Sequence, residues 1–548
     1  MPSVSAPLAA PVPTTVELSI RLLRVGTTAQ TALKNDHELT QRDCSVGTLF
    51  SGETAHEAPG WVRFIEPASP GLQNELRAQQ VSAVLLVEAT HAGVSRLLAV
   101  SFGQGHHSID PDRIERQFGM RIVLNSVARG GLKALDSATL DTTVIQRRTQ
   151  ASRATDLREF GVDTDRDLLR LASGHPTDAN LAKSLSGKDA LHIRRSLTVD
   201  MLPDLCSRLL TIHGQAHYKR DFGFIDHIQP VMDSSERARL DAEAYGELCK
   251  LVGGQPSDLH LAIPEPLTGD ASPEISYYGA GLPKGPKQAF VDVDIDDYIA
   301  ELRDGDFASL TCMDDIRLSH DVRAADGGRG RVRLYNCLVC DVDLGGRRCV
   351  LFDGDWYQID ARYAADIEAG YQRLLSPSFL PSTTHKTERS LIADLAASNT
   401  QMLCIDQTRI APAGAPRAQL EACDFFSLDR QLIHLKDGND SAPLSHLWNQ
   451  AFVSAEALVR DSAARRGFRR AIRDREAHYG RGNFRQLAPR IERMDAGQYP
   501  IVFGVMRKPG KRSGTVDLPF FSKVALLATT RRLQLMGFNV YLHLIQKP

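Results

Sequence analysis

Residues 420–436 read Leu-Glu-Ala-Cys-Asp-Phe-Phe-Ser-Leu-Asp-Arg-Gln-Leu-Ile-His-Leu-Lys, and they decide the fold expected for the C-terminal third of the chain. The first part of this stretch is a short apolar run that carries Glu421 and Asp424, and the second part, residues 431–436, alternates as a strand does. Residues 427–430, Ser-Leu-Asp-Arg, are mostly polar and separate the two runs, as in a β-hairpin. The stretch therefore predicts two paired strands that carry acidic and basic groups.

Polar residues in the second strand share one face. Side chains alternate with period two along a strand, so His434 and Lys436 point to the same side. Together with a carboxylate from the first strand, Asp424, they could hold a divalent cation beside a positive charge. Hydrolysis of a phosphodiester needs such a set, because a metal polarises the phosphate and activates water while a lysine stabilises the developing charge. Glu421 would join only through a bulge or twist, since residues three apart face opposite sides of a strand.

The elements around the hairpin extend this prediction. Residues 384–398 are expected to form an amphipathic helix with Glu388 near its start, and residues 444–458 a second helix that carries Gln450. The other elements expected here are strands at 402–405, 501–506 and 539–545 and a helix at 522–536. The expected order is helix, strand, strand, strand, helix, strand, helix, strand.

That order and those residues resemble the PD-(D/E)XK nuclease superfamily, whose core carries an acid on its second strand and an acid-x-lysine pair on its third. By position, Asp424 matches the first acid, Lys436 the lysine, and Glu388 the acid that the first helix often supplies. Gln450 matches a glutamine found on the second helix in some branches. His434 stands where the pattern has its middle acid, so the resemblance implies a metal site of Asp424, His434 and Glu388 that favours softer cations than Mg²⁺.

Six short motifs are spread along the chain, namely Phe102-Gly103-x-Gly105, Phe118-Gly119 with Leu124-Asn125, Trp356-Tyr357, Ile433-His434-Leu435-Lys436, Leu444-Ser445-His446-Leu447 and Leu518-Pro519-Phe520-Phe521-Ser522. Together they are similar to a sporadically distributed, poorly characterised bacterial family of about this length. Families of this type commonly lie in mobile genomic islands. The resemblance therefore implies a role in defence against phage or foreign DNA.

Length and composition set the domain organisation. A chain of 548 residues is longer than one ordinary domain, and its 42% of hydrophobic residues can form several packed cores. The fold class expected is multidomain α+β. The predicted divisions are a disordered tail at 1–14, an N-terminal α+β domain at 15–195, a central α+β domain at 196–380 and a restriction-endonuclease-like domain at 381–548.

Charge and hydropathy restrict the partners and the location. The formal net charge is −2, so any affinity for nucleic acid must come from local basic patches. The sequence contains no apolar run of the roughly 18 to 20 residues that cross a membrane. Its first residues lack the basic region of a signal peptide, and a cytoplasmic location without membrane contact is expected.

Nine cysteines are scattered along the chain, and an odd, dispersed set argues against a disulfide framework. Cys337-x-x-Cys340, with Cys349 close behind, is either half of a zinc site or part of a buried strand at 334–342. The buried strand is favoured, because residues three apart in a strand face opposite ways and cysteine then acts as a small hydrophobic residue.

The N-terminal region offers weaker signals. Gly103-x-Gly105 is either a phosphate cradle or, as favoured, a plain turn before a helix that begins near Pro111. Residues 145–158 are basic and polar, which suits a solvated loop better than a phosphate contact. The other elements expected are strands at 15–25, 80–88, 95–102 and 121–127 and a helix at 163–172.

A basic stretch lies between Arg460 and Arg493. It contains eleven arginines and four acidic residues, with three aromatic residues among them. Arginine forks suit phosphate oxygens, and aromatic rings stack on exposed bases. A solvated helix face is the alternative for each basic run taken singly. The candidate nucleic-acid contacts are Arg465, Arg466, Arg469, Arg470 and Arg473 at helical spacing, with Lys508, Lys511 and Arg512 in a later loop.

Three hypotheses follow from the sequence. The first is a metal-dependent endonuclease, or an effector derived from one, that acts on DNA or RNA and uses Mg²⁺ or Mn²⁺ if it is active. In the second, the same fold is catalytically inactive because of His434 and senses nucleic acid without a cofactor. The third is a scaffold whose charged face docks a phage or host protein. A homo-oligomer is compatible with all three.

Overall fold

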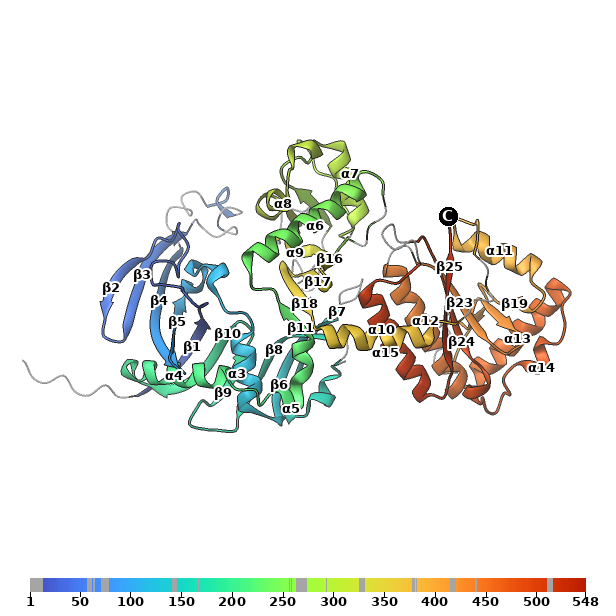
Figure 1. Ribbon diagram of the computed structural model, residues 1–548, viewed down its shortest axis with the longest axis horizontal. Coiled ribbons are helices and arrows are strands. Elements are labelled where there is room, and N and C mark those ends of the chain that lie inside the picture. The colour runs from blue at the N-terminus through green and yellow to red at the C-terminus, as the bar shows by residue number, and fades with distance from the viewer. Residues whose placement is uncertain are drawn as a thin grey trace, which may run out of the picture. The chain divides into compact units, whose positions relative to one another are not determined.

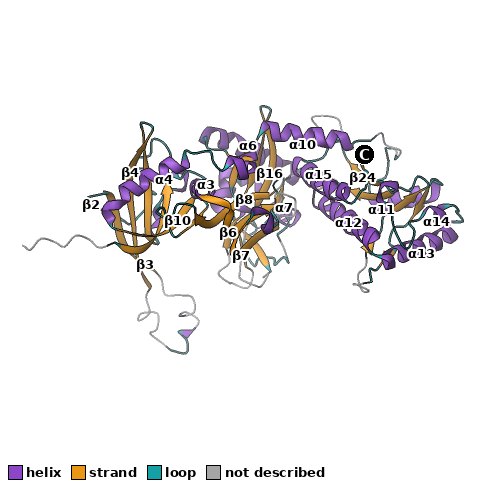
Figure 2. Cartoon of the chain, turned by 90° about the horizontal axis from the view of Figure 1, so that it is seen from below, coloured by secondary structure: helices purple, strands orange, loops and turns teal. Residues whose placement is uncertain are grey.

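The computed structural model contains both helices and strands in several sheets, and it confirms the multidomain α+β class (Figure 1, Figure 2). A helix that combines the length and the apolar character needed to cross a bilayer is not found among the described residues. The predicted tail lies outside those residues except for its last two. The structure describes residues 13–56, 62, 65–69, 78–139, 145–162, 164, 167–255, 257, 259–262, 274–291, 293–324, 331–376, 380, 382–413, 420–438, 441–509 and 516–548.

The chain divides into two compact units, and the first holds residues 1–138, 147–163 and 167–225. Its centre is a ten-stranded sheet in the order β2-β3-β4-β5-β1-β10-β9-β8-β6-β7. The helices α3 (Phe118–Ser126) and α4 (Leu202–His213) share one apolar core with this sheet. The strands are β1 (Thr14–Leu22), β2 (Thr40–Cys44), β3 (Gly47–His56), β4 (Ala78–His91), β5 (Val94–Gly103), β6 (Val127–Thr139), β7 (Ile145–Thr155), β8 (Asp167–Pro176), β9 (Ser184–Gly187) and β10 (Ala190–Leu197).

Three sequence predictions in this unit are wrong. The strand expected at 121–127 is the helix α3, which is buried on most sides, so its sequence is a continuous apolar run that periodicity cannot distinguish from a buried strand. The helix expected at 163–172 is the strand β8, and the loop expected at 145–158 contains the strand β7. Strand pairing with β9 fixes the conformation of β8, and tertiary pairing of this kind overrides local propensity.

The glycine pair of the Gly103-x-Gly105 motif is explained by packing. A β-carbon on Gly103 would lie 2.2 Å from the carbonyl oxygen of Val81, and one on Gly105 would lie 2.2 Å from that of Ala83. Both glycines therefore allow the chain to pass close to β4. Gly103 also has a φ of +56°, which favours glycine. The expected helix after this turn is reduced to a single 3-10 turn at Pro111–Arg113, which Asp110 caps.

The second unit, which includes residues 226–548, begins with a central α+β region. Its sheets have the orders β11-β18-β17-β16-β12 and β13-β14-β15. The elements are β11 (Ile228–Pro230), α6 (Ser234–Val252), β12 (His260–Leu261), β13 (Ile275–Tyr278), α7 (Ile295–Asp304), α8 (Met313–Ser319), β14 (Asp321–Ala324), β15 (Arg331–Arg333), α9 (Leu334–Cys337), β16 (Leu338–Leu344), β17 (Arg347–Phe352) and β18 (Asp355–Ile359).

The cysteines of this region are core residues. Cys337, Cys340 and Cys349 are buried in one hydrophobic cluster, and burial raises the pKa of the Cys337 thiol to about 12. Within the described part of the chain, no group of three potential metal ligands includes any of them. The cysteines are buried as the favoured interpretation expected, but Cys337 lies in the single helical turn α9 and the strand begins only at Leu338.

The C-terminal part of the second unit is organised around a sheet in the order β19-β22-β23-β24-β25. Antiparallel pairing joins β19, β22 and β23, and parallel pairing joins β23, β24 and β25. The predicted element order is found, with α13 and short elements added. The elements are α11 (Glu388–Ser398), β19 (Met402–Cys404), β20 (Arg409–Ile410), β21 (Leu420–Glu421), β22 (Phe425–Ser427), β23 (Leu432–Asp437), α12 (Ser441–Arg460), α13 (Ser462–Tyr479), α14 (Phe484–Leu487), β24 (Ile501–Arg507), α15 (Phe520–Leu535) and β25 (Val540–Gln546).

Alternation along these strands divides the apolar side chains between two cores. Phe426 and Leu432 pack in the core that contains α12 and α15, whereas Phe425, Ile433 and Leu435 pack in the core that contains α11. Helices thus cover both faces of the sheet, as expected for a sheet with parallel strands.

The helix α10 (Ala361–Leu374) belongs to the same core as the C-terminal sheet. Lys523 of α15 is only 1% exposed, and its Nζ lies 2.7 Å from Oε2 of Glu368 on α10 and 2.9 Å from Oδ2 of Asp517. The same ammonium group lies 4.3 Å from the centre of the Tyr371 ring. A buried cation with two carboxylates and an aromatic ring ties α10 to α15.

Candidate active site

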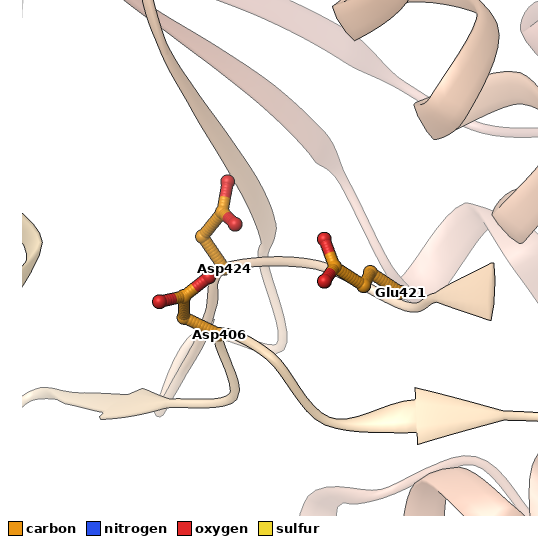
Figure 3. A group of neighbouring side chains, drawn as sticks. All are labelled: Asp406, Glu421 and Asp424. Atoms are coloured by element: carbon orange, nitrogen blue, oxygen red, sulfur yellow. The ribbon is translucent and has the colours of Figure 1, made fainter. Parts of the chain in front are cut away.

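Three carboxylates from neighbouring segments form an acidic cluster, which we define as Asp406, Glu421 and Asp424. One ligand oxygen from each lies within 4.8 Å of the others (Figure 3). Asp406 follows β19, Glu421 ends β21, and Asp424 immediately precedes β22. Three oxygen ligands at this separation can hold a divalent cation.

The backbone explains why these side chains meet. The amide groups of Ile405 and Asp406 both donate to the carbonyl oxygen of Asp424, at 2.7 and 3.0 Å, and so join the end of β19 to the start of β22. Residues 422–424 lie between β21 and β22 and belong to neither strand. This break in the strand turns Glu421 toward Asp424. Glu421 was expected to reach the site only if such a bulge or twist interrupted the strand.

Asp424 is the most buried member of the cluster, at 7% exposure. Burial raises the pKa of its carboxyl group to about 8, against the effect of the Leu435 amide, which donates to Oδ2 at 2.6 Å. The charges of Asp406, Glu388 and Glu421 raise that pKa further. Burial, followed by the charge of Glu421, also raises the pKa of Asp406. The cluster therefore favours a bound proton or cation over three bare carboxylates.

Two further predicted residues lie beside this cluster as an ion pair. Nζ of Lys436 lies 3.1 Å from Oε2 of Glu388, and the backbone amide of Asp437 donates to the same oxygen at 3.2 Å. Glu388 is the first residue of α11, so its position is fixed by the start of that helix. Its negative charge contributes to the raised pKa values of Asp406 and Asp424.

Gln450 of α12 contacts the cluster directly. Its Nε2 donates to Oε2 of Glu421 at 2.9 Å, which leaves the second oxygen of that carboxylate for another partner. The structure thus brings together five of the six residues that the sequence singled out for catalysis, and it adds Asp406. The signal for Asp406 was its place directly after the first strand of the hairpin sheet, where it lies next to the start of β22.

His434 is not brought to the acidic cluster. It is 1% exposed, and neither ring nitrogen has a hydrogen-bond partner. Its ring lies 6.2 Å from that of Phe503 on the adjacent strand, in line with the alternation that places Leu432 in the same core. Burial lowers the pKa of His434 to about 4, so the ring is neutral. The structure therefore does not support His434 as a metal ligand, and Asp406 and Glu421 supply the missing negative charge.

Two of the five predicted arginines on α13 are structural. Arg465 is 4% exposed and donates from Nε to the carbonyl of Ile491 at 2.7 Å and from Nη1 to that of Leu458 at 2.7 Å. It also donates to the carbonyls of Val459 and Glu492. Nη1 of Arg469 donates to the carbonyls of Ala488 and Pro489. Both guanidinium groups therefore donate hydrogen bonds to backbone carbonyls of the same C-terminal region.

The other three arginines, Arg466, Arg470 and Arg473, are exposed and lie three and four residues apart on one side of α13, so we name them the α13 arginine face. Arg473 forms an ion pair with Asp474, in which Nη2 of Arg473 lies 2.8 Å from Oδ1 of Asp474. Lys508 is exposed beyond β24. The other two predicted contacts, Lys511 and Arg512, lie outside the described residues.

Comparison with known proteins adds a family but no activity. One family model, described only as a family of unknown function, matches residues 18–546, which include most of both units. Neither the curated proteins nor the solved structures contain a match to this chain.

Proposed function

The chain belongs to the DUF6119 family, whose function is unknown, and from its acidic cluster we propose that it binds nucleic acid and hydrolyses phosphodiester bonds with a divalent metal. One observation carries the proposal. A buried aspartate, Asp424, has its pKa raised to about 8 by burial and lies with two further carboxylates at metal-ligand separation. Three acids crowded in this way need a compensating positive charge.

The donor set fits Mg²⁺ or Mn²⁺. Asp406, Glu421 and Asp424 offer only oxygen atoms, which hard cations prefer, and the absence of the histidine from this set removes the preference for softer metals that the sequence suggested. When bound, such a cation polarises the scissile phosphate and lowers the pKa of a water molecule.

The surrounding residues have distinct roles in this proposal. Lys436 would stabilise the negative charge that develops on the phosphate, and Glu388 would hold its ammonium group through the 3.1 Å contact. Gln450 would orient Glu421 through its hydrogen bond. Lys436 would thus act on the substrate, whereas Glu388 and Gln450 would position Lys436 and Glu421. None of the three would bind the metal directly.

Lys436→Met should lower the rate of metal-dependent cleavage about a hundredfold, because the side chain keeps its length but loses the charge that stabilises the transition state. The rate should be measured on plasmid DNA and on a long RNA, each with Mg²⁺ and with Mn²⁺. Binding of Mn²⁺ should persist, since Lys436 is not one of the three acids, and calorimetry can check it.

Lys386→Met is the matched control, because Lys386 is exposed and lies just before α11. It should cleave at the wild-type rate. If the wild-type protein cleaves neither nucleic acid with either metal, the enzyme proposal fails. If Lys436→Met cleaves as fast as the wild type, the proposed role of Lys436 fails.

Replacing all three residues of the α13 arginine face with glutamine should weaken binding to nucleic acid and reduce its salt dependence. Each lost phosphate contact removes about 0.7 to 0.9 from the slope of log K against log salt concentration, so the slope should become less steep by roughly 2 to 3. Filter binding or fluorescence anisotropy from 50 to about 300 mM salt measures this slope.

The control for the arginine face is a second triple variant with the same change in charge, in which Arg239, Arg362 and Arg373 become glutamine. These arginines are exposed on α6 and α10. A slope that changes equally in both triple variants would show that net charge alone, and not the α13 arginine face, governs binding.

A second candidate function is a catalytically inactive sensor of nucleic acid, which the exposed α13 arginine face would support without any metal at the acidic cluster. Salt-dependent binding without cleavage would select this candidate, and the absence of both would leave a scaffold for a phage or host protein. Under either nucleic-acid function we propose a cytoplasmic role in defence against phage. Plaque counts on cells that express the wild type or Asp424→Asn test that role, and equal counts would contradict an enzymatic defence.

A further inference from the structure

A row of small hydroxyl side chains crosses the ten-stranded sheet of the first unit. Direct cross-strand partners run from Ser101 on β5 to Ser19 on β1, His192 on β10, Ser186 on β9 and Ser173 on β8. Their neighbours in sequence, such as Leu18, Ile193 and Leu185, belong to the core with α3 and α4, so by alternation the row lies on the opposite face. Serine is not favoured in strands, where β-branched and aromatic residues predominate. Four serines in one row therefore need an explanation other than strand stability.

The row forms the floor of a cavity of about 570 Å³. All five of its members line this cavity, together with charged side chains that include Lys133 and Arg194. Small side chains in the middle of a sheet, with longer ones around them, leave a hollow. Its volume falls in the range of about 300 to 1,000 Å³ that is typical of sites for small molecules.

A half-buried arginine reaches into the serine row. Nη1 of Arg21 donates to Oγ of Ser19 and to Oγ of Ser101, both at 3.2 Å. The cross-strand partners of Arg21 are Ala99 and Ala190, whose small side chains leave room for the guanidinium group. Arg21 is not itself one of the residues that line the cavity, but these two contacts place its positive charge directly beside the cavity floor.

This arginine lacks a carboxylate at ion-pair distance within the described part of the chain. The acid that influences it, Asp189, is already held by Arg116 at 2.8 Å and by the backbone amide of Gln117 at 2.8 Å. Burial lowers the pKa of Arg21, and burial together with the positive charge of Arg21 lowers the pKa of His192. A partly desolvated guanidinium beside an imidazole and two hydroxyl groups is a site that favours an anion.

We propose that this cavity binds a small phosphate ester of about the size of a nucleotide, with its phosphate on Ser19 and Ser101 beside the guanidinium group of Arg21. A phosphate group has several acceptor oxygens and can use a guanidinium fork and two hydroxyl groups at once. Lys133 and Arg194 add positive charge around the cavity, where Glu17 is the one acid among the lining residues and lies 3.7 Å from Arg194. The hydroxyl groups of Ser173 and Ser186 extend the floor and can hydrogen-bond the organic part of the ligand.

The site lies in the first unit and does not depend on the acidic cluster of the second, so the two proposals can fail separately. The test is calorimetric titration of the full chain with AMP, glucose 6-phosphate and inorganic phosphate. EDTA is added so that metal at the acidic cluster does not contribute. Tighter binding of AMP than of the other two would identify a nucleotide site, and tighter binding of glucose 6-phosphate a sugar-phosphate site. Equal binding of all three would show that the cavity recognises the phosphate alone.

Arg21→Gln should weaken binding of the best of these compounds tenfold or more, because a charge-assisted hydrogen bond is lost. Ser186→Leu should weaken it to a similar degree by filling the cavity, and it keeps the test decisive if Arg21→Gln does not fold. Arg42→Gln, an exposed change on β2 of the same sheet, should bind like the wild type. The proposal is overturned if none of the three compounds binds at millimolar concentration, or if Arg21→Gln and Ser186→Leu both bind as the wild type does.

Discussion

Asp424→Asn should lower the rate of metal-dependent cleavage by about a thousandfold or more. The substitution keeps the size of the side chain, and the amide oxygen of asparagine can still accept the hydrogen bond from the Leu435 amide. It removes the negative charge that would hold the cation, and a bound metal contributes several kcal/mol to the stabilisation of the transition state. At about 1.4 kcal/mol for each factor of ten, that loss corresponds to roughly three orders of magnitude in rate.

The matched control is Asp429→Asn, because Asp429 lies in the turn of the same hairpin and is exposed. It should cleave at the wild-type rate under every metal condition. Single-turnover kinetics with the enzyme in excess over DNA or RNA gives the rate of the chemical step. Cleavage by Asp424→Asn at more than a tenth of the wild-type rate would show that the acidic cluster is not the catalytic metal site.

The second large effect is on stability, which should fall as pH rises when no metal is present. The carboxyl group of Asp424 has a pKa of about 8 in the folded chain, against 3.8 for an ordinary aspartate. The folded state therefore holds a proton that the unfolded state has released, and the stabilisation from this group is complete below about pH 3.8 and lost as pH rises to about 8. Between these two pH values this one group removes on the order of 5 kcal/mol from the free energy of unfolding. Asp406, whose pKa is also raised, acts in the same direction.

Divalent metal should reverse this loss. In urea unfolding at pH 8, Mn²⁺ at a hundred times its dissociation constant should raise the free energy of unfolding by about 2.7 kcal/mol. At pH 5 the gain should be smaller, because the cation must displace the proton from Asp424. Asp424→Asn should be nearly insensitive to Mn²⁺, and its stability should decline less between pH 5 and pH 8. An equal effect of Mn²⁺ on the wild type and on Asp424→Asn would place the bound metal elsewhere.

Particular residues show how far the sequence could predict this site. The chain order of the C-terminal elements was predictable because α11, α12 and α15 are amphipathic or apolar over long runs and the strands between them are short. Glu388, Lys436 and Gln450 were predictable from their positions in that order. The place of Asp406 directly after the first strand was a signal, but its contact with Asp424 depends on two backbone hydrogen bonds between segments that are 18 residues apart.

His434 and Arg465 show where the sequence suggests a functional role that the structure does not support. Both are polar residues in a pattern that suggests a ligand, and only the packing around them reveals another role. Period two predicts which side of β23 His434 faces, but not that this side is closed by the Phe503 ring. Helical spacing groups Arg465 with Arg466, but only the fold shows that Arg465 lies under the chain segment 491–492, whose carbonyls it binds.

The bond network of Lys523 determines where the chain can be cut for separate study of its C-terminal sheet. A fragment that starts at residue 381 would omit α10 and with it Glu368 and Tyr371, so the ammonium group of Lys523 would lose one of its two carboxylates and its aromatic cover. The apolar side chains of α15 that α10 shields would face solvent as well. A fragment for crystallisation or binding work should therefore begin before Asp360, the residue that caps α10.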